Sequence, residues 1–167
     1  MRTKKFNFPA TPPSGSAKTL DLTAPTSTTA AAAGEKAIAT SGIDRSRIGL
    51  MIDTSVCRAR LEPSSAVTVH DALGLPTTCL NFDLSNACLG FANAMSLLAS
   101  RIERGELEAA LVVSGEDGGP LVEETIAALL REGVTRLDLK RAYASLTIGS
   151  GAAAMVLTSS RISWSSH

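Results

Sequence analysis

The stretch Asp83-Leu-Ser-Asn-Ala-Cys-Leu-Gly-Phe91 decides the fold of this chain, because it joins a strand-like run to a long helical pattern. The apolar run Cys79-Leu-Asn-Phe82 precedes it, and residues 89–104 follow with apolar side chains at helical spacing. The buried stripe of that helix is Phe91, Met95, Leu98 and Ile102. A glycine at position 105 then ends the helix. A strand that leads directly into an amphipathic helix is the building unit of α/β proteins.

Strand-like and helical patterns alternate on both sides of this unit. We expect helices over 30–41, 64–73, 89–104 and 121–131, and strands over 48–52, 79–82, 109–113 and 152–157. This alternation predicts an α/β fold with a mostly parallel sheet covered by helices. Residues 1–29 are rich in Pro, Thr and Ser without apolar periodicity, so we expect a disordered or unassigned extension there and one folded domain over 30–167.

Composition excludes several classes of function. The 16 basic and 16 acidic residues balance, so nothing favours nucleic acid or an anionic membrane. The longest apolar runs fall far short of the roughly 20 residues of a membrane span. The three cysteines are an odd number without metal-ligand spacing, which argues against a disulfide framework and against a metal site. We therefore expect a soluble, cytoplasmic protein.

Cys88 is the best-placed nucleophile among the three cysteines. It stands where a strand ends and a helix begins, so unpaired backbone N–H groups can favour the reactive thiolate. The small neighbours Ala87 and Gly90 would let a substrate approach closely. Taken alone, a free cysteine is more often a small buried hydrophobe, and we keep that interpretation for Cys57 and Cys79.

The segment around Cys88 resembles the nucleophile segment of ketoacyl synthase III and related thiolase-superfamily condensing enzymes. The resemblance extends to other segments in the same order along the chain. These are Arg47-Ile-Gly-Leu-Met-Ile-Asp-Thr-Ser55, Leu61-Glu-Pro-Ser-Ser65, Ala110-Leu-Val-Val-Ser-Gly-Glu116 and Leu146-Thr-Ile-Gly-Ser-Gly-Ala-Ala-Ala154. Val56-Cys-Arg and Leu61-Glu-Pro-Ser are similar to the branch that condenses two long acyl chains head to head.

The resemblance implies a thiolase-like fold and an acyltransferase-type Claisen condensation in fatty-acid or long-chain hydrocarbon biosynthesis. In such enzymes the cysteine that matches Cys88 takes an acyl group from an acyl-CoA or acyl-ACP thioester, with no tightly bound cofactor. The glutamate that matches Glu62 is implied to act as a base across a homodimer interface. A lone glutamate before proline is equally often a solvated loop residue.

Two further residue groups are assigned structure rather than chemistry. The segment around Gly149 and Ser150 resembles the family's turn into a strand and lacks the Gly-x-Ser-x-Gly pattern of a nucleophile elbow. His70 precedes Cys88, whereas the family's catalytic histidine follows the cysteine. We therefore expect neither Ser150 nor His70 to take part in catalysis.

Relative to the family, the chain looks truncated, since family members carry a histidine and an asparagine in a second, similar half. The resemblance therefore implies an N-terminal thiolase-like half with little condensing activity by itself. The alternative is a non-catalytic remnant or interaction subunit of such an enzyme. A generic α/β domain with a buried cysteine is a third hypothesis. The acyl-chain length and the choice between CoA and ACP do not follow from the sequence.

Overall fold

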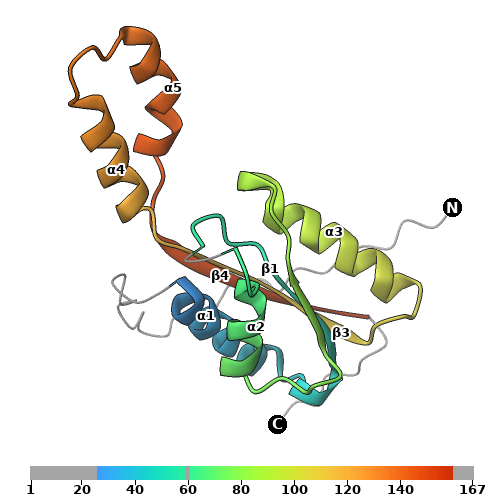
Figure 1. Cartoon of the computed structure of the whole chain (residues 1–167). Helices are drawn as coiled ribbons and strands as arrows, with labels where there is room; N and C mark the ends of the chain where they lie inside the picture. Colours follow the sequence, from blue (N-terminus) through green and yellow to red (C-terminus); the bar gives the residue numbers. More distant parts are fainter. Residues whose placement is uncertain (1–25, 59–60, 160–167) are drawn as a thin grey trace, which may run out of the picture.

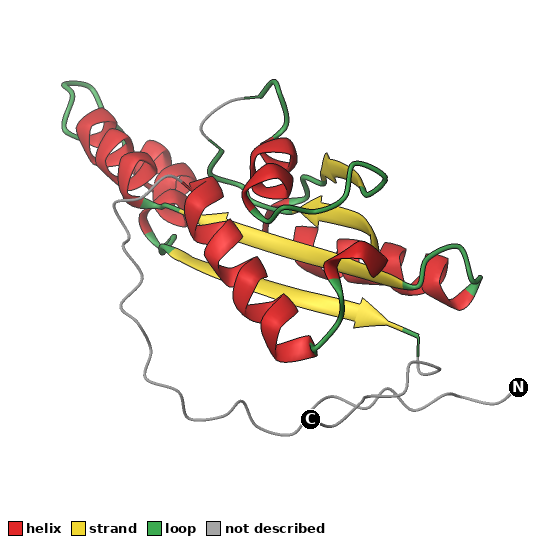
Figure 2. Ribbon diagram, turned by 90° about the horizontal axis from the view of Figure 1, so that it is seen from below, coloured by secondary structure: helices red, strands yellow, loops and turns green. Residues whose placement is uncertain are grey.

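The structure is a computed structural model that describes residues 26–58 and 61–159. Its helices are α1 (Thr26–Ser41), η1 (Arg45–Arg47), α2 (Ser65–Ala72), η2 (Ala87–Leu89), α3 (Gly90–Glu103), α4 (Gly119–Leu129) and α5 (Arg136–Leu146). Its strands are β1 (Ile48–Asp53), β2 (Leu80–Asp83), β3 (Ala109–Glu116) and β4 (Gly151–Thr158). The four strands form one sheet in the order β2-β1-β3-β4, with α1 and α2 on one face and α3 on the other (Figures 1 and 2).

The two central strands are buried on both faces. β1 pairs in parallel with β2 on one side and with β3 on the other. Continuous apolar runs suit such strands, because helices cover both of their faces. One core cluster lies under α1 and α2, and a second lies under α3 around Leu98. The predicted helix-covered, mostly parallel sheet is confirmed.

The last strand runs antiparallel to its neighbour, which agrees with the prediction of a mostly parallel sheet. β4 pairs antiparallel with β3, and Glu116 lies opposite Gly151. The reason is a second helix, α5, that the apolar pattern did not predict: α4 leads the chain away from the sheet and α5 returns it to the same end (Figure 1). A capping box between Thr135 and Asp138 starts α5 and was the local signal for it.

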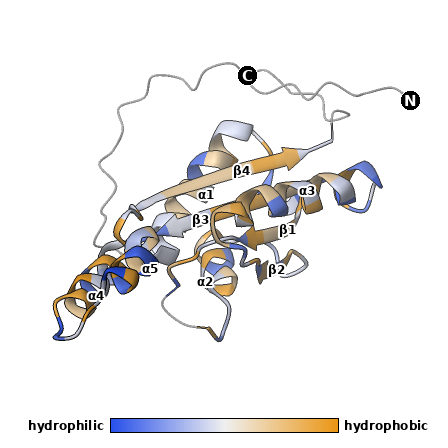
Figure 3. Cartoon of the chain, turned by 90° about the horizontal axis from the view of Figure 1, so that it is seen from above, coloured by the Kyte–Doolittle hydropathy of each residue, from blue (hydrophilic) through white to orange (hydrophobic). Residues whose placement is uncertain are grey.

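The α4–α5 hairpin stands apart from the rest of the molecule. In the described part of the chain neither helix has a buried residue, and the two helices pack chiefly on each other (Figure 1). Figure 3 shows hydrophobic residues along α4. The exposed large apolar side chains of the hairpin are Leu121, Ile126, Leu130, Val134, Leu137, Leu139 and Tyr143. At its base, the hydroxyl of Ser150 accepts from the Gly118 N–H at 3.0 Å and donates to Asp117 at 3.3 Å.

Helix α1 begins at Thr26 rather than at residue 30, because its first turn is fixed by tertiary contact. A Cβ added at Gly115 of β3 would collide with the Thr26 carbonyl and lie 2.8 Å from Thr29 Oγ1 and 2.9 Å from the Ala30 nitrogen. Residues 1–25 of the expected extension lie outside the described residues. At the other end of α1, Gly42 has a φ of 63°, and Gly105 after α3 has a φ of 76°, as expected of helix C-terminal glycines.

None of the helices in the described ranges is both long and apolar enough to cross a membrane.

Replacing Gly115 by alanine is expected to lower the free energy of unfolding by roughly 1–3 kcal/mol, because the new methyl group has no space against α1. Urea unfolding followed by circular dichroism measures the change. Gly149→Ala is the matched control, since a Cβ there meets nothing within 4 Å, and it should stay within about 1 kcal/mol of wild type. Equal stabilities of the two variants would contradict the packing of α1 on β3.

Candidate functional site

Cys88 lies at the carboxyl end of the sheet, between β2 and α3. It is the middle residue of η2, a single turn of 3-10 helix that runs directly into α3. Of the three cysteines Cys88 is exposed, whereas Cys57 is partly buried and Cys79 is buried. The prediction that Cys88 lies where β2 ends and a helix begins is therefore confirmed. The difference is that one turn of 3-10 helix, η2, precedes α3 and contains Cys88.

The backbone just before Cys88 is held in an unusual conformation. Ala87 has a φ of 44°, in the left-handed region that costs a residue with a side chain roughly 1–2 kcal/mol. Two hydrogen bonds of Asn86 hold this turn: its carbonyl accepts from the Leu89 N–H at 3.0 Å, and its side-chain amide donates to Asn93 in α3 at 2.6 Å. Strain of this kind in proteins clusters at functional sites.

The glycine at position 90 lies in a tightly packed place. Gly90 is buried, and a Cβ on it would lie 3.3 Å from the Leu84 carbonyl and 3.4 Å from Thr54 Cβ. Gly90 therefore lets α3 pack closely on the end of β1. Ala87, by contrast, is exposed.

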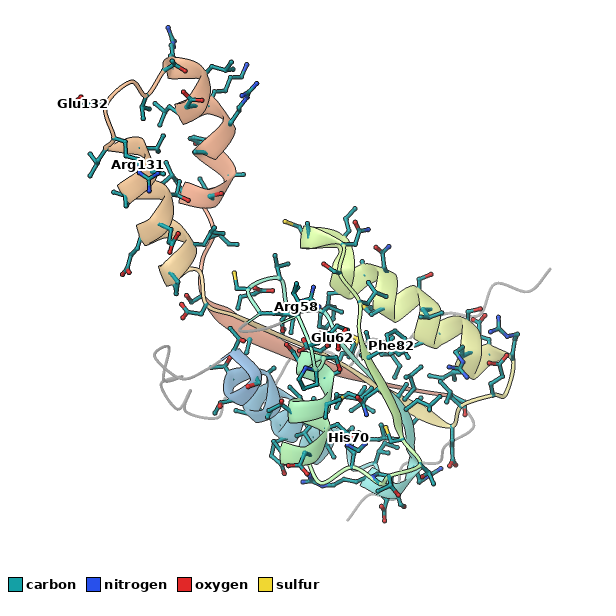
Figure 4. The ribbon with its side chains drawn as sticks, viewed as in Figure 1. Arg58, Glu62, His70, Phe82, Arg131 and Glu132 are labelled. Atoms are coloured by element: carbon teal, nitrogen blue, oxygen red, sulfur yellow. The ribbon has the colours of Figure 1, made fainter. Side chains whose placement is uncertain are left out.

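Glu62 lies in the segment between β1 and α2 and is exposed (Figure 4). The neighbouring Leu61 is 80% exposed. Among the described residues, no hydrogen bond or ion pair joins Glu62 to Cys88 of the same chain. The structure thus does not bring these two predicted site residues into contact within one chain.

Two carboxylates at strand ends hold the segment that carries Glu62, and sequence reasoning gave neither of them a role. Asp83, at the end of β2, accepts hydrogen bonds from Arg58 and from the first N–H groups of α2. Glu116, at the end of β3, accepts from the Val56 N–H at 2.7 Å and the Cys57 N–H at 2.9 Å. The available signal was their position, because polar side chains at the carboxyl ends of parallel strands are where α/β proteins place their sites.

Comparison with known proteins decides the family of this chain. A family model described as 3-Oxoacyl-[acyl-carrier-protein (ACP)] synthase III matches residues 82–166. The chain belongs to the 3-oxoacyl-[acyl-carrier-protein] synthase III family.

Two relatives that are similar in sequence to the chain are acyl-CoA:acyl-CoA alkyltransferases. The chain is 43% identical over 130 residues to an acyl-CoA:acyl-CoA alkyltransferase of Xanthomonas campestris, covering 78% of the chain and 38% of the relative. A Shewanella oneidensis acyl-CoA:acyl-CoA alkyltransferase is 40% identical over 126 residues, with 75% and 36% covered. The chain thus spans less than two fifths of the length of either relative.

A crystal structure in the same family shares the fold. Xanthomonas campestris OleA, solved as a cysteine-to-serine variant with bound lauric acid and lauroyl-CoA, is 41% identical with a TM-score of 0.75. The match covers 83% of this chain and 41% of OleA. The expected resemblance to a synthase III-like, thiolase-like half is confirmed.

The other two cysteines of this synthase III family chain are poorly suited to nucleophilic attack. Burial raises the pKa of the Cys79 thiol to about 11. Burial also raises the pKa of Cys57, and the nearby Glu116 carboxylate adds to the effect. Both thiols therefore stay protonated at neutral pH, as expected of packing cysteines.

His70 and Ser150 make structural contacts in this synthase III family chain. The His70 ring nitrogen Nε2 lies 3.2 Å from the Pro76 carbonyl and donates to it, which ties α2 to the turn before β2. Ser150 links the two sides of the hairpin base, as described above. Within the described residues, no group of three or more His, Cys, Asp or Glu side chains could hold a metal ion.

Asp53 is a buried carboxylate that sequence reasoning missed. It is 1% exposed, at the end of β1 and in register with Asp83 of β2. Its Oδ1 accepts from the Ser55 N–H and hydroxyl, while its Oδ2 has no hydrogen-bond partner among the described residues. Burial raises the pKa of the Asp53 carboxyl; hydrogen bonds from Ser55 oppose this, and the charges of Asp83 and Glu116 add to it.

The raised pKa of Asp53 predicts a pH-dependent loss of stability. A carboxyl with a higher pKa in the folded state costs stability only when ionised. The cost is absent below the unfolded pKa of about 3.9, grows as the pH rises toward the folded pKa, and is complete above it. The free energy of unfolding of wild type should therefore fall relative to Asp53→Asn as the pH rises from about 4 to 8, measured by urea unfolding at each pH.

The exposed carboxyl of Asp44 is the control, because its pKa is shifted in the opposite direction from that of Asp53. Hydrogen bonds from Ser46 lower the pKa of Asp44, so its contribution to stability is present above the unfolded pKa and is lost as the pH falls. The difference between wild type and Asp44→Asn should therefore not fall with rising pH. Parallel pH profiles of wild type and Asp53→Asn would contradict the burial of Asp53 as an ionisable group.

Proposed function

We propose that this chain is the nucleophile-bearing part of a condensing acyltransferase, in which Cys88 carries the acyl group. The thiolate of Cys88 attacks the carbonyl carbon of an acyl thioester, a new C–S bond forms, and the bond to the leaving thiol breaks. The leaving thiolate takes up a proton as it departs. A second acyl thioester, as a carbon nucleophile, then displaces the acyl group from Cys88 in a Claisen condensation.

The observation that carries this proposal is the local structure around Cys88. An exposed thiol stands in a single turn at the start of a long helix, directly after a residue in the left-handed region. Helix starts offer unpaired N–H groups, which stabilise a thiolate and the oxyanion formed when it attacks a carbonyl. Neither Cys57 nor Cys79 has this combination of exposure and position.

The relatives support acyl thioesters as the substrate class. Both alkyltransferases are named for two acyl-CoA partners, and the OleA variant structure holds lauroyl-CoA. We propose long-chain acyl-CoA as the substrate, with acyl carrier protein thioesters as the alternative donor that the family's name suggests. In this proposal the chain forms a homodimer and needs no tightly bound cofactor.

Glu62 is the proposed base for the second step, acting near Cys88 of the partner subunit. The lack of contact between Glu62 and Cys88 within one chain is compatible with this arrangement. OleA has been solved as variants of one glutamate and of one cysteine that stand 26 positions apart, and Glu62 and Cys88 have the same separation. This equal spacing supports the pairing of the two residues.

Incubation of the purified chain with lauroyl-CoA is expected to add one lauroyl group to Cys88, because its exposed thiol alone among the three cysteines is free to attack. Intact-mass spectrometry measures the adduct, and peptide mapping locates it. Cys88→Ala should abolish it, while Cys57→Ser should retain it. An adduct that survives Cys88→Ala would refute the proposal, and no adduct in wild type would favour the non-catalytic alternative.

Glu62→Gln is expected to leave the rate of Cys88 acylation within about twofold of wild type, because the base is needed only after the acyl group is in place. Stopped-time intact-mass measurements give the rate. In a full-length condensing relative, the same exchange at the aligned glutamate should abolish condensed product while the acyl adduct persists. Loss of acylation in Glu62→Gln, or unchanged condensation in the relative, would rule out this role.

A further inference from the structure

The segment that carries Glu62 is fixed on both of its sides by a single carboxylate. Asp83 Oδ2 accepts from Arg58 Nη1 at 2.9 Å and from the Ser65 N–H at 3.0 Å, and its Oδ1 accepts from the Ala66 N–H at 2.8 Å. Arg58 precedes Glu62 in the chain and Ser65 follows it. The Asp83 side chain thus binds residues on both sides of Glu62.

The same carboxylate belongs to the segment that carries the nucleophile. Asp83 is the last residue of β2 and the first of the stretch that leads to Cys88. The following residue, Leu84, is held to β1 by a hydrogen bond of its N–H to the Asp53 carbonyl at 2.9 Å. The position of Asp83 is therefore set by the sheet, and both Glu62 and Cys88 are placed relative to it.

Capping of α2 does not explain the whole arrangement. The bonds to Ser65 and Ala66 satisfy free N–H groups at the start of α2, which is a common task of an aspartate. The bond to Arg58 adds nothing to that cap. The side chains of Arg58 and Asp83 are only 19% and 8% exposed, so this ion pair is shielded from the solvent that weakens surface pairs.

We infer that Arg58 and Asp83 are positioning residues that hold Glu62 in place relative to the nucleophile segment, an inference that rests on the proposed role of Glu62. Glu116 supports the same segment from β3 through the Val56 and Cys57 N–H groups. Glu62 itself is exposed, so its reach toward a second copy is set by the anchored residues on either side of it. Arg58 is the residue to test, because its removal leaves the cap of α2 intact.

The first test measures whether the ion pair orders the Glu62 segment. Arg58→Gln should speed hydrogen exchange of the amides in residues 61–66 by about tenfold or more, since a charge-assisted bond is lost. Arg58→Lys should restore part of the protection, because it keeps the charge. The matched control is Arg104→Gln, which removes an exposed pair with Glu106 and should leave residues 61–66 unchanged. Equal exchange in wild type and Arg58→Gln would overturn the inference.

The second test measures whether residue 62 comes within disulfide distance of Cys88 in a second copy. In Glu62→Cys, oxidation by copper phenanthroline in air should form a disulfide between the introduced cysteine and Cys88 of a second copy, seen as a covalent dimer and mapped by digestion. Adding Arg58→Gln should lower the dimer yield several-fold, and Arg58→Lys should recover part of it. An unchanged yield would overturn the inference, since a merely structural residue would not govern this distance.

The two tests separate this inference from the proposed function. Failure of Glu62→Cys to form the mapped dimer in any background would refute the role of Glu62 across the dimer and, with it, the positioning of a base. Cys88 acylation by lauroyl-CoA does not depend on Arg58, so it should stay at the wild-type rate in Arg58→Gln. Slowed acylation in that variant would overturn the inference, because Arg58 would then act on the nucleophile.

Discussion

The burial of β1 and β3 on both faces is the constraint on which the rest of this structure depends. Strands covered by helices on either side have no room for polar side chains along their length, so polar groups gather where the strands end. Asp53, Asp83 and Glu116 are the last residues of their three strands. The carboxyl ends of these strands thereby form a polar rim, and the segment that follows β1 donates hydrogen bonds to all three acids of the rim.

The three acids at the strand ends differ in what they bind. Asp83 and Glu116 are satisfied by backbone N–H groups and by Arg58, and they order the segments that follow β1. Asp53 is buried at the same edge, and its Oδ2 has no hydrogen-bond partner among the described residues. Burial raises the pKa of its carboxyl, so ionisation of Asp53 costs stability. Cys88 stands beside this rim on a turn held by Asn86 and by the close packing of Gly90 on Thr54. The turn that carries Cys88, the proposed nucleophile, is thus held by uncharged groups of the neighbouring residues.

The sequence predicted the sheet and its covering helices because strong apolar periodicity reports burial directly. It placed α3 within a residue or so, and it placed Cys88 where β2 gives way to that helix. It did not predict α5, whose residues have no buried face and therefore show no apolar stripe. The start of α1 was also missed, since the contact of Thr26 with Gly115 joins residues far apart in the chain. Arg58, Asp83 and Glu116 gained a role only when the fold brought them together.

The antiparallel pairing of β3 with β4 has a consequence for how this fold can change. Because Glu116 lies opposite Gly151, the two strands are a β-hairpin whose connecting loop has grown into α4 and α5. The ends of that loop are already joined by the Ser150 bonds, so its closure does not depend on the helices. The closure entropy of a loop depends only weakly on its length. Such a loop can be lengthened, shortened or exchanged between relatives without disturbing the sheet, which makes it the part of the molecule most open to evolutionary remodelling.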